Sequence, residues 1–141
     1  MGVLNRTPDS FSDGGLFTDF DAALWQAIKM TEEGAAILDI GGESTRPGAQ
    51  TVSVQVELDR VIPLIERLAR EIDVPISIDT SKPEVMREAV RAGAAMINDV
   101  YALRLPGAVE TARECKVPVC LMHMLGEPRS MQKNPHYKNV V

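Results

Sequence analysis

The alternation of short apolar runs with longer amphipathic segments predicts an α/β fold with a parallel sheet. Five strand–helix or strand units follow one another without a linker, a repeat or a low-complexity stretch. Periodicity alone leaves two architectures open, a doubly wound sheet and a (β/α)8 TIM barrel. Polar residues end almost every apolar run, and side chains from many strand ends converge only when a sheet closes around an axis. The sequence therefore predicts a (β/α)8 barrel, of which this chain supplies about the first five strands.

The expected strands are almost continuously apolar, as strands covered on both faces should be. They span residues 2–5, 37–41, 76–79, 96–100 and 119–122. The polar residues at or near their carboxyl ends are Asn5, Asp39, Asp79, Asn98 with Asp99, and His123.

The first two expected helices have an apolar side and recognisable ends. Residues 21–33 place Ala23, Leu24, Ala27 and Ile28 on one side and meet Gly34, which suits the left-handed position after a helix. Residues 53–72 carry a long apolar stripe at helical spacing, and Pro63 is expected to kink this helix.

The third helix is expected to begin with a capping box formed by Ser81 and Glu84, with Pro83 in the first turn and Gly93 ending it. A fourth helix is expected over residues 106–114.

Composition and charge restrict the class of protein. The 141 residues, 45% of them hydrophobic and 25% charged, fit one globular domain over residues 1–141. A net charge of -5 argues against binding to nucleic acid. There is no apolar run of about 18 residues and no signal peptide pattern, so neither a membrane span nor secretion is expected. The two cysteines, Cys115 and Cys120, fit no zinc or redox spacing and are expected to be buried free thiols of a cytoplasmic protein.

Two connections after strands are rich in polar and glycine residues. Residues 5–15 could form a mobile lid, or a solvated turn whose Asp and Ser side chains bond to their own backbone. Residues 41–48 combine glycines, a hydroxyl and Arg46, which suits an anionic or flat heteroaromatic ligand. The alternative for the second connection is a plain turn in which Arg46 pairs with a surface carboxylate.

Asp79 and Asn98 end neighbouring strands, so they are expected to lie together at the barrel mouth. A carboxylate and an amide match the edge of a pterin or a related amino-pyrimidinone. The alternative is that Asp79 caps the next helix and Asn98 ties down a loop. His123, with no second histidine at ligand spacing, is interpreted as structural rather than as a metal ligand or a base. Met122 is expected in the core, with pocket lining as the alternative.

Five motifs occur in a fixed order along the chain: NRTPDSFSDGG, DIGGESTRPGA, SIDTSKPEV, INDV and CLMHM. In sequence and spacing they resemble the dihydropteroate synthases over essentially all of residues 1–137. The resemblance implies a (β/α)8 barrel in the folate pathway, in which 4-aminobenzoate displaces diphosphate from 6-hydroxymethyl-7,8-dihydropterin diphosphate and sulfonamides compete with the amine.

The resemblance also implies roles for individual residues. Asn5 would be the ligand of a Mg²⁺ ion bound to the diphosphate. In the first loop, Phe11 and Asp13 would lie against the arylamine and the reacting carbon, and Asp13 would stabilise developing positive charge. The residues implied at the pterin and pocket positions are Thr45, Arg46, Asp79, Asn98 and Met122.

Two departures from the family stand out. Arg6 replaces a usually aliphatic residue, so the first turn of the lid is expected to pack differently or to bind the diphosphate directly. No segment matches the family's later DPGFGFGK, SRK and RVHD motifs, so the chain is expected to be a portion of a longer protein or to be completed by another chain. Family members usually dimerise through barrel helices that this span lacks.

Two other functions compete with the synthase. A pterin-dependent methyltransferase would share Asp79 and Asn98 but has no need of the TPDSFSDGG loop. A non-catalytic fragment would keep part of the pterin pocket without turnover.

Overall fold

The computed structural model describes residues 1–6, 16–44, 50–127, 131, 136 and 138–139. Strands and helices alternate strictly along these residues. The elements are β1 (Gly2–Asn5), α1 (Leu16–Glu32), β2 (Leu38–Gly41), α2 (Val54–Glu71), β3 (Ile76–Asp79), α3 (Pro83–Ala92), β4 (Met96–Asp99), α4 (Ala108–Cys115) and β5 (Val119–Leu121).

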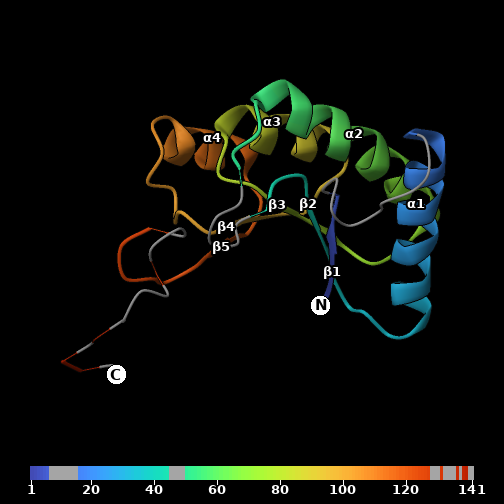
Figure 1. Ribbon diagram of the computed structural model, residues 1–141, viewed down its shortest axis with the longest axis horizontal. Coiled ribbons are helices and arrows are strands. Elements are labelled where there is room, and N and C mark those ends of the chain that lie inside the picture. Colours follow the sequence, from blue (N-terminus) through green and yellow to red (C-terminus); the bar gives the residue numbers. More distant parts are fainter. Residues whose placement is uncertain (7–15, 45–49, 128–130, 132–135, 137, 140–141) are drawn as a thin grey trace.

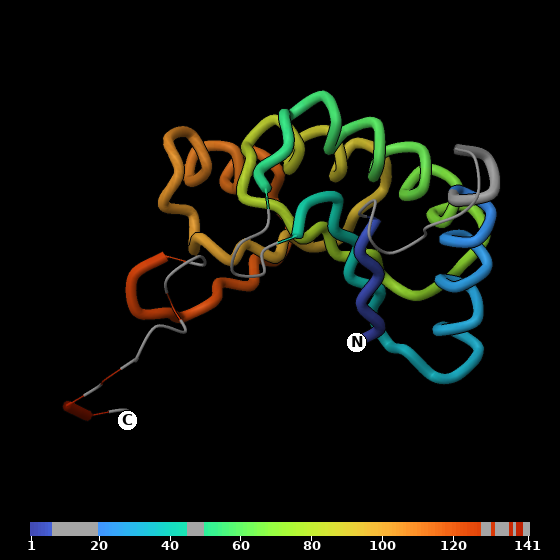
Figure 2. The backbone as a smooth tube through the Cα atoms, in the orientation of Figure 1, coloured from blue at the N-terminus to red at the C-terminus, as the bar shows by residue number. Residues whose placement is uncertain are grey.

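The five strands form one parallel sheet in the order β1-β2-β3-β4-β5. Helices α2, α3 and α4 lie on the same side of this sheet, with α1 beside its β1 end (Figure 1). The tube in Figure 2 follows the same arrangement, with successive helices packed side by side. A doubly wound sheet would reverse its strand order and place helices on both faces. Sequential order with helices on one side is instead the arrangement of the first five units of a (β/α)8 barrel, as predicted.

The core lies between the sheet and the helices. Leu4, Ile40, Ile78 and Ile97 occupy one row across β1 to β4 and are all buried. The helices cover this row with further buried apolar residues, among them Val61, Leu64, Leu68, Val85, Met86 and Ala89. This layer fixes the strand register, because a slip by one residue would turn every apolar side chain to the other face.

Most expected elements are confirmed to within a residue or two, and α1 differs most. The helix α1 begins at Leu16 rather than at residue 21, because residues 16–20 contain no glycine or proline that would stop it. Its end is as expected. Gly34 has φ +99°, and the N–H groups of Gly34 and Ala35 donate to the carbonyls of Thr31 and Met30 at 3.0 and 2.9 Å, which is the Schellman pattern.

The start of α3 contradicts the expected capping box. Lys82 is the N-cap residue, without a side-chain cap hydrogen bond, and Pro83 occupies the first turn. The Ser81 hydroxyl donates to Asp99 Oδ1 at 2.5 Å instead. Pro83 favours an extended conformation at Lys82, so the helix begins only after Lys82. Ser81 therefore lies one residue before the N-cap position and cannot cap the helix.

The start of α4 also differs from the expected one. Gly107, with φ +82°, is the N-cap residue, and the helix begins at Ala108 rather than at residue 106.

The expectation of buried cysteines is wrong for Cys120, which is exposed, while Cys115 is half-buried; both are free thiols, as expected. Among the helices that the structure describes, none is both long and apolar enough to cross a membrane.

Candidate active site

The sheet face opposite the helices carries polar side chains. Because strand residues alternate between faces, the residues flanking the buried apolar row all belong to this second face. They include Asn5, Asp39, Ser77, Asp79, Asn98 and Cys120. We call this the inner face, since it faces the axis of the barrel.

Three of the predicted site residues lie in one row of the inner face. Asn5 pairs with Gly41, Gly41 with Asp79, and Asp79 with Asn98 in the sheet register. A Cβ at Gly41 would lie 2.8 Å from Asn5 Oδ1, so any larger residue would displace the Asn5 amide, whereas Asp79 Oδ2 at 3.6 Å would be in ordinary contact. The expectation that Asp79 and Asn98 lie together is confirmed, and Asn5 joins them.

Asp39 lies on the same face, two residues before Gly41, and binds the Asn98 side chain, a role that the sequence alone did not assign. The Asn98 Nδ2 donates to Asp39 Oδ2 at 3.0 Å, which fixes which way the amide points. Asp39 is 4% exposed, and its Oδ1 has no hydrogen-bond partner among the described residues; the same holds for the fully buried Ser77 Oγ in the next strand. The sequence did contain a signal for this role, because Asp39 stands two residues before Gly41 and therefore lies on the same face of the sheet.

Asp79 has an unusual protonation equilibrium. Burial, together with the nearby charges of Asp39, Glu57 and Asp99, raises its pKa from 3.8 to about 7. The carboxyl group therefore changes its charge near neutral pH. A site that recognises N–H donors needs the ionised form, in which both oxygens accept.

Asp99 faces the opposite way from Asn98 and has a different role. It is fully buried and accepts hydrogen bonds from Ser81 Oγ at 2.5 Å, from Tyr101 N at 2.8 Å and from Leu103 N at 2.7 Å. These bonds hold a turn in which Ala102 and Leu103 have φ of 53° and 58°, strained values for non-glycine residues. Asp99, rather than Asn98, therefore holds the loop that follows β4. The other alternative, that Asp79 caps α3, is wrong, because Lys82 is the N-cap residue.

A cavity of about 250 Å³ opens beside Asp79 at the carboxyl end of the sheet. It is formed by the connections that follow β2, β3 and β4 and by the first turn of α2. Its lining residues are Glu43, Thr51, Glu57, Asp79, Thr80, Ser81, Lys82, Tyr101 and Leu105. Of the predicted site residues that the structure describes, Asp79 is the one that lines this cavity.

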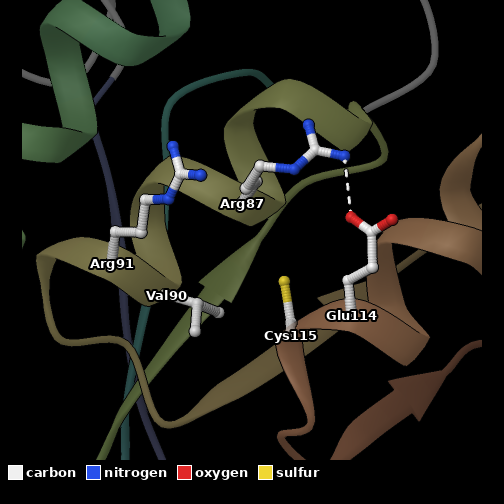
Figure 3. Close-up of a pocket in the computed structure, with 5 residues that line it drawn as sticks. All are labelled: Arg87, Val90, Arg91, Glu114 and Cys115. Atoms are coloured by element: carbon white, nitrogen blue, oxygen red, sulfur yellow. Dashed lines mark hydrogen bonds and ion pairs between the residues drawn. The ribbon is translucent and has the colours of Figure 1, made fainter.

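Another cavity, of about 240 Å³, lies between α3 and α4 and contains none of the predicted site residues. Figure 3 shows the Cys115 sulfur directed into it below Arg87, which donates to Glu114 at 3.3 Å. Burial raises the pKa of the Cys115 thiol, which keeps it in its unreactive form. The predicted residues Asn5, Asp79 and Asn98 lie on the inner face instead.

A comparison with known families decides the assignment. The model of the pterin binding enzymes matches residues 1–141. This chain belongs to the pterin-binding enzyme family. It is 58% identical over 141 residues to a dihydropteroate synthase of Haemophilus influenzae, covering 100% of this chain and 51% of that protein.

Solved structures of this family agree with the fold. A dihydropteroate synthase of Yersinia pestis in a sulfonamide drug complex is 55% identical with a TM-score of 0.89, covering 98% of this chain and 50% of that one. The Xanthomonas albilineans enzyme with 4-aminobenzoic acid is 58% identical with a TM-score of 0.87, covering 97% and 48%. The chain thus spans about half the length of the relatives it matches.

The structure positions some of the family-implied residues and not others. Asn5, Asp79 and Asn98 converge, and Met122 follows β5 with its N–H donating to the Asp99 carbonyl at 3.3 Å. His123 is the next residue and is exposed. The residues Phe11, Asp13, Thr45 and Arg46 lie outside the described residues.

Asn5 offers one oxygen donor at the inner face for a divalent cation held jointly with a substrate. The described residues contain no group of three or more His, Cys, Asp or Glu side chains that could hold a metal by themselves. Asn5 Oδ1 is at the mouth, on an exposed residue beside the open side of Gly41. Mg²⁺ usually keeps several waters and binds few protein oxygens together with substrate phosphates, so Asn5 would supply one oxygen of a shell that the substrate and waters complete.

Arg6, the departure from the family pattern, is directed toward α2 and α1. Its Nη1 donates to the Arg60 carbonyl at 2.7 Å, and its guanidinium lies 5.6 Å from the Phe20 ring centroid. Of the two roles expected for Arg6, these contacts support the packing role.

Proposed function

We propose that this chain carries the pterin-binding half of a dihydropteroate synthase. The reaction is the condensation of 6-hydroxymethyl-7,8-dihydropterin diphosphate with 4-aminobenzoate to 7,8-dihydropteroate and diphosphate. The observation that carries the proposal is the row formed by Asn5, Asp79 and Asn98 around Gly41, on the polar face of the sheet.

Pterin recognition follows from the chemistry of this row. The ionised Asp79 accepts N–H groups of the pterin, and Asn98 offers an amide whose orientation Asp39 fixes. The amide and carboxylate lie in adjacent strands at the same register, so one flat ring edge can meet both. Met122, at the end of β5, would line the pocket.

The bond changes take place at the mouth. The nitrogen of 4-aminobenzoate attacks the methylene carbon of the pterin, the C–O bond to diphosphate breaks, and the amine loses one proton. Asn5 would hold a Mg²⁺ ion, and that ion would supply positive charge to stabilise the diphosphate as it leaves. Thr45 and Arg46 would bind substrate, while Phe11 and Asp13 would face the amine and the reacting carbon, with Asp13 stabilising positive charge there.

The same proposal includes a cytoplasmic location, a homodimer of the complete protein and competition by sulfonamides. Small-molecule substrates fit an acidic chain of net charge -5 better than nucleic acid does.

The test is diphosphate release from the pterin substrate and 4-aminobenzoate, combined with the intact mass of the purified protein. We expect Mg²⁺-dependent turnover in a protein of about twice this length, the size typical of a complete barrel. A 15.4 kDa species that binds pterin without turnover would favour the non-catalytic fragment. Absence of both binding and turnover in the longer protein would contradict the proposal.

A further inference from the structure

Lys82 lies between two carboxylates that come from different parts of the chain. Its Nζ donates to Glu43 Oε2, after β2, and to Glu57 Oε2, in the first turn of α2. The side chains of Lys82 and Glu43 are 20% and 22% exposed, and that of Glu57 is 1% exposed. This is a mostly buried three-residue cluster rather than a surface ion pair, so its geometry is fixed.

Glu43 also closes the connection between β2 and α2. The same oxygen that Lys82 binds accepts a hydrogen bond from Val52 N at 3.2 Å, which joins the two ends of residues 43–52. Directly after Val52, Ser53 caps α2, because its Oγ accepts a hydrogen bond from Val56 N at 3.3 Å. Both ends of the connection are therefore bound to fixed elements.

The strand side of the connection is held as well. Arg60 Nη1 donates to the Gly42 carbonyl at 2.7 Å. Gly42 packs so closely on α2 that an added Cβ would lie 2.9 Å from both Glu57 Cγ and Val61 Cγ1. Gly42 and Glu43 are thus fixed to the helix that Lys82 contacts through Glu57.

Lys82 itself follows Asp79 by three residues, at the start of α3. It therefore links the connection after β2, which contains Thr45 and Arg46 in its sequence, to the connection that follows the pterin carboxylate. We propose that Lys82 is a positioning residue that holds Glu43 and Val52, the described ends of the β2–α2 connection, beside the carboxyl end of β3, and that substrate binding requires this arrangement. This inference rests on the proposed synthase function for the identity of the substrates.

The charges explain why a lysine is required. Burial on its own lowers the pKa of Lys82, but the hydrogen bonds to Glu43 and Glu57 outweigh it and the net effect is a raised pKa. The ammonium group is therefore charged throughout the working pH range. Without it, Glu57 would be a buried carboxylate with no cation between it and Glu43, and the two carboxylates would repel each other.

The experiment compares Lys82→Met with Lys82→Arg in the complete gene product, with Lys29→Met as the matched control. Lys29 forms a single ion pair to Glu33 at 3.8 Å, on a side chain that is 47% exposed. We expect Lys82→Met to raise KM for the substrates roughly tenfold or more, because a loosely held connection must be ordered on binding. Lys82→Arg keeps two donors and should recover most of this loss, while Lys29→Met should leave KM within about twofold.

A second variant covers the case in which Lys82→Met does not fold. Glu43→Gln keeps the Lys82–Glu57 pair but weakens the closure to Val52, so it should fold and still raise KM. A purely structural role would reduce the fraction of active enzyme, lowering apparent kcat at unchanged KM. Unchanged KM in both folded variants would overturn the proposal.

Hydrogen exchange at the Val52 amide provides a measure that does not depend on activity. We expect its exchange to be at least about tenfold faster in Glu43→Gln and Lys82→Met than in Lys29→Met. Faster exchange in a protein without synthase turnover would support the positioning role while contradicting the proposed function. Turnover with Val52 exchange unchanged in the variants would contradict the positioning role and leave the function intact.

Discussion

The two faces of the same five-stranded sheet differ in nearly every respect. On the helix side, Ile78 belongs to a fully apolar and buried row, whereas its neighbour Asp79 belongs to the polar row of the inner face. One residue along a strand therefore separates a position that stabilises the fold from one that we propose binds the pterin. Apolar core positions and polar inner-face positions therefore alternate along the same short strands, so adjacent substitutions should have opposite effects on stability.

The largest effect is expected on the helix side. Ile78→Ala should lower the free energy of unfolding by roughly 2–5 kcal/mol, because Ile78 is fully buried between the sheet and the helices. Ile78→Val is the matched control and should cost about 0.5–1.5 kcal/mol. Denaturant unfolding of the purified variants measures both, and an Ile78→Ala cost below about 1 kcal/mol would show that this row is not the core.

On the inner face, Asp79→Asn should increase stability at neutral pH. A carboxyl whose pKa is raised from 3.8 to about 7 keeps its proton more tightly when folded, so its ionisation destabilises the fold as the pH rises from about 4 to about 7. The amide removes this loss, and we expect a gain between roughly 1 and 4 kcal/mol at pH 8 that vanishes near pH 4. Unfolding curves at several pH values provide the test, and a variant less stable than the parent at pH 8 would refute it.

A smaller effect is expected at Ser77, also on the inner face. Its hydroxyl is buried without a hydrogen-bond partner among the described residues. Ser77→Ala should therefore leave the free energy of unfolding unchanged or raise it by up to about 1 kcal/mol. A clear loss of stability would mean that the hydroxyl is satisfied by a group such as a buried water.

A modest effect, comparable in size to that at Ser77, is expected at Arg6, which links the base of the first connection to α2. Arg6→Val removes its bond to the Arg60 carbonyl and its contact with Phe20, so we expect a loss of about 0.5–1.5 kcal/mol in unfolding free energy. KM for the pterin diphosphate should stay within about twofold if Arg6 packs rather than binds the anion. A tenfold rise in KM would instead assign Arg6 to the diphosphate.

The sequence was sufficient to predict the elements that a local, periodic pattern of apolar residues specifies. The apolar runs located β1 and β3 to the residue, and the polar residues that end β1, β3 and β4 predicted a common site at Asn5, Asp79 and Asn98. The position of Gly34 after α1 was likewise predictable, because only the backbone conformation decides it.

The sequence did not predict the side-chain contacts that depend on a residue far away along the chain. Ser81 and Glu84 have capping-box spacing, but the Ser81 hydroxyl binds Asp99, 18 residues away. Glu57 lies in the first turn of α2 and is almost fully buried, and only the contact with Lys82, 25 residues away, explains a carboxylate there. Such pairs leave no trace in local periodicity, which is why the cluster at the mouth emerged only from the structure.

In the proposed pterin site, Asp79 is the group on which recognition of the pterin depends most. Calorimetric titration of the complete protein with pterin at pH 8 should compare the parent, Asp79→Asn and Ser77→Ala. We expect Asp79→Asn to weaken binding roughly 100-fold, since hydrogen bonds to a charged acceptor are lost, and Ser77→Ala to change it by less than about threefold. Equal pterin affinity in Asp79→Asn and the parent would contradict the assignment of the inner face as the pterin site.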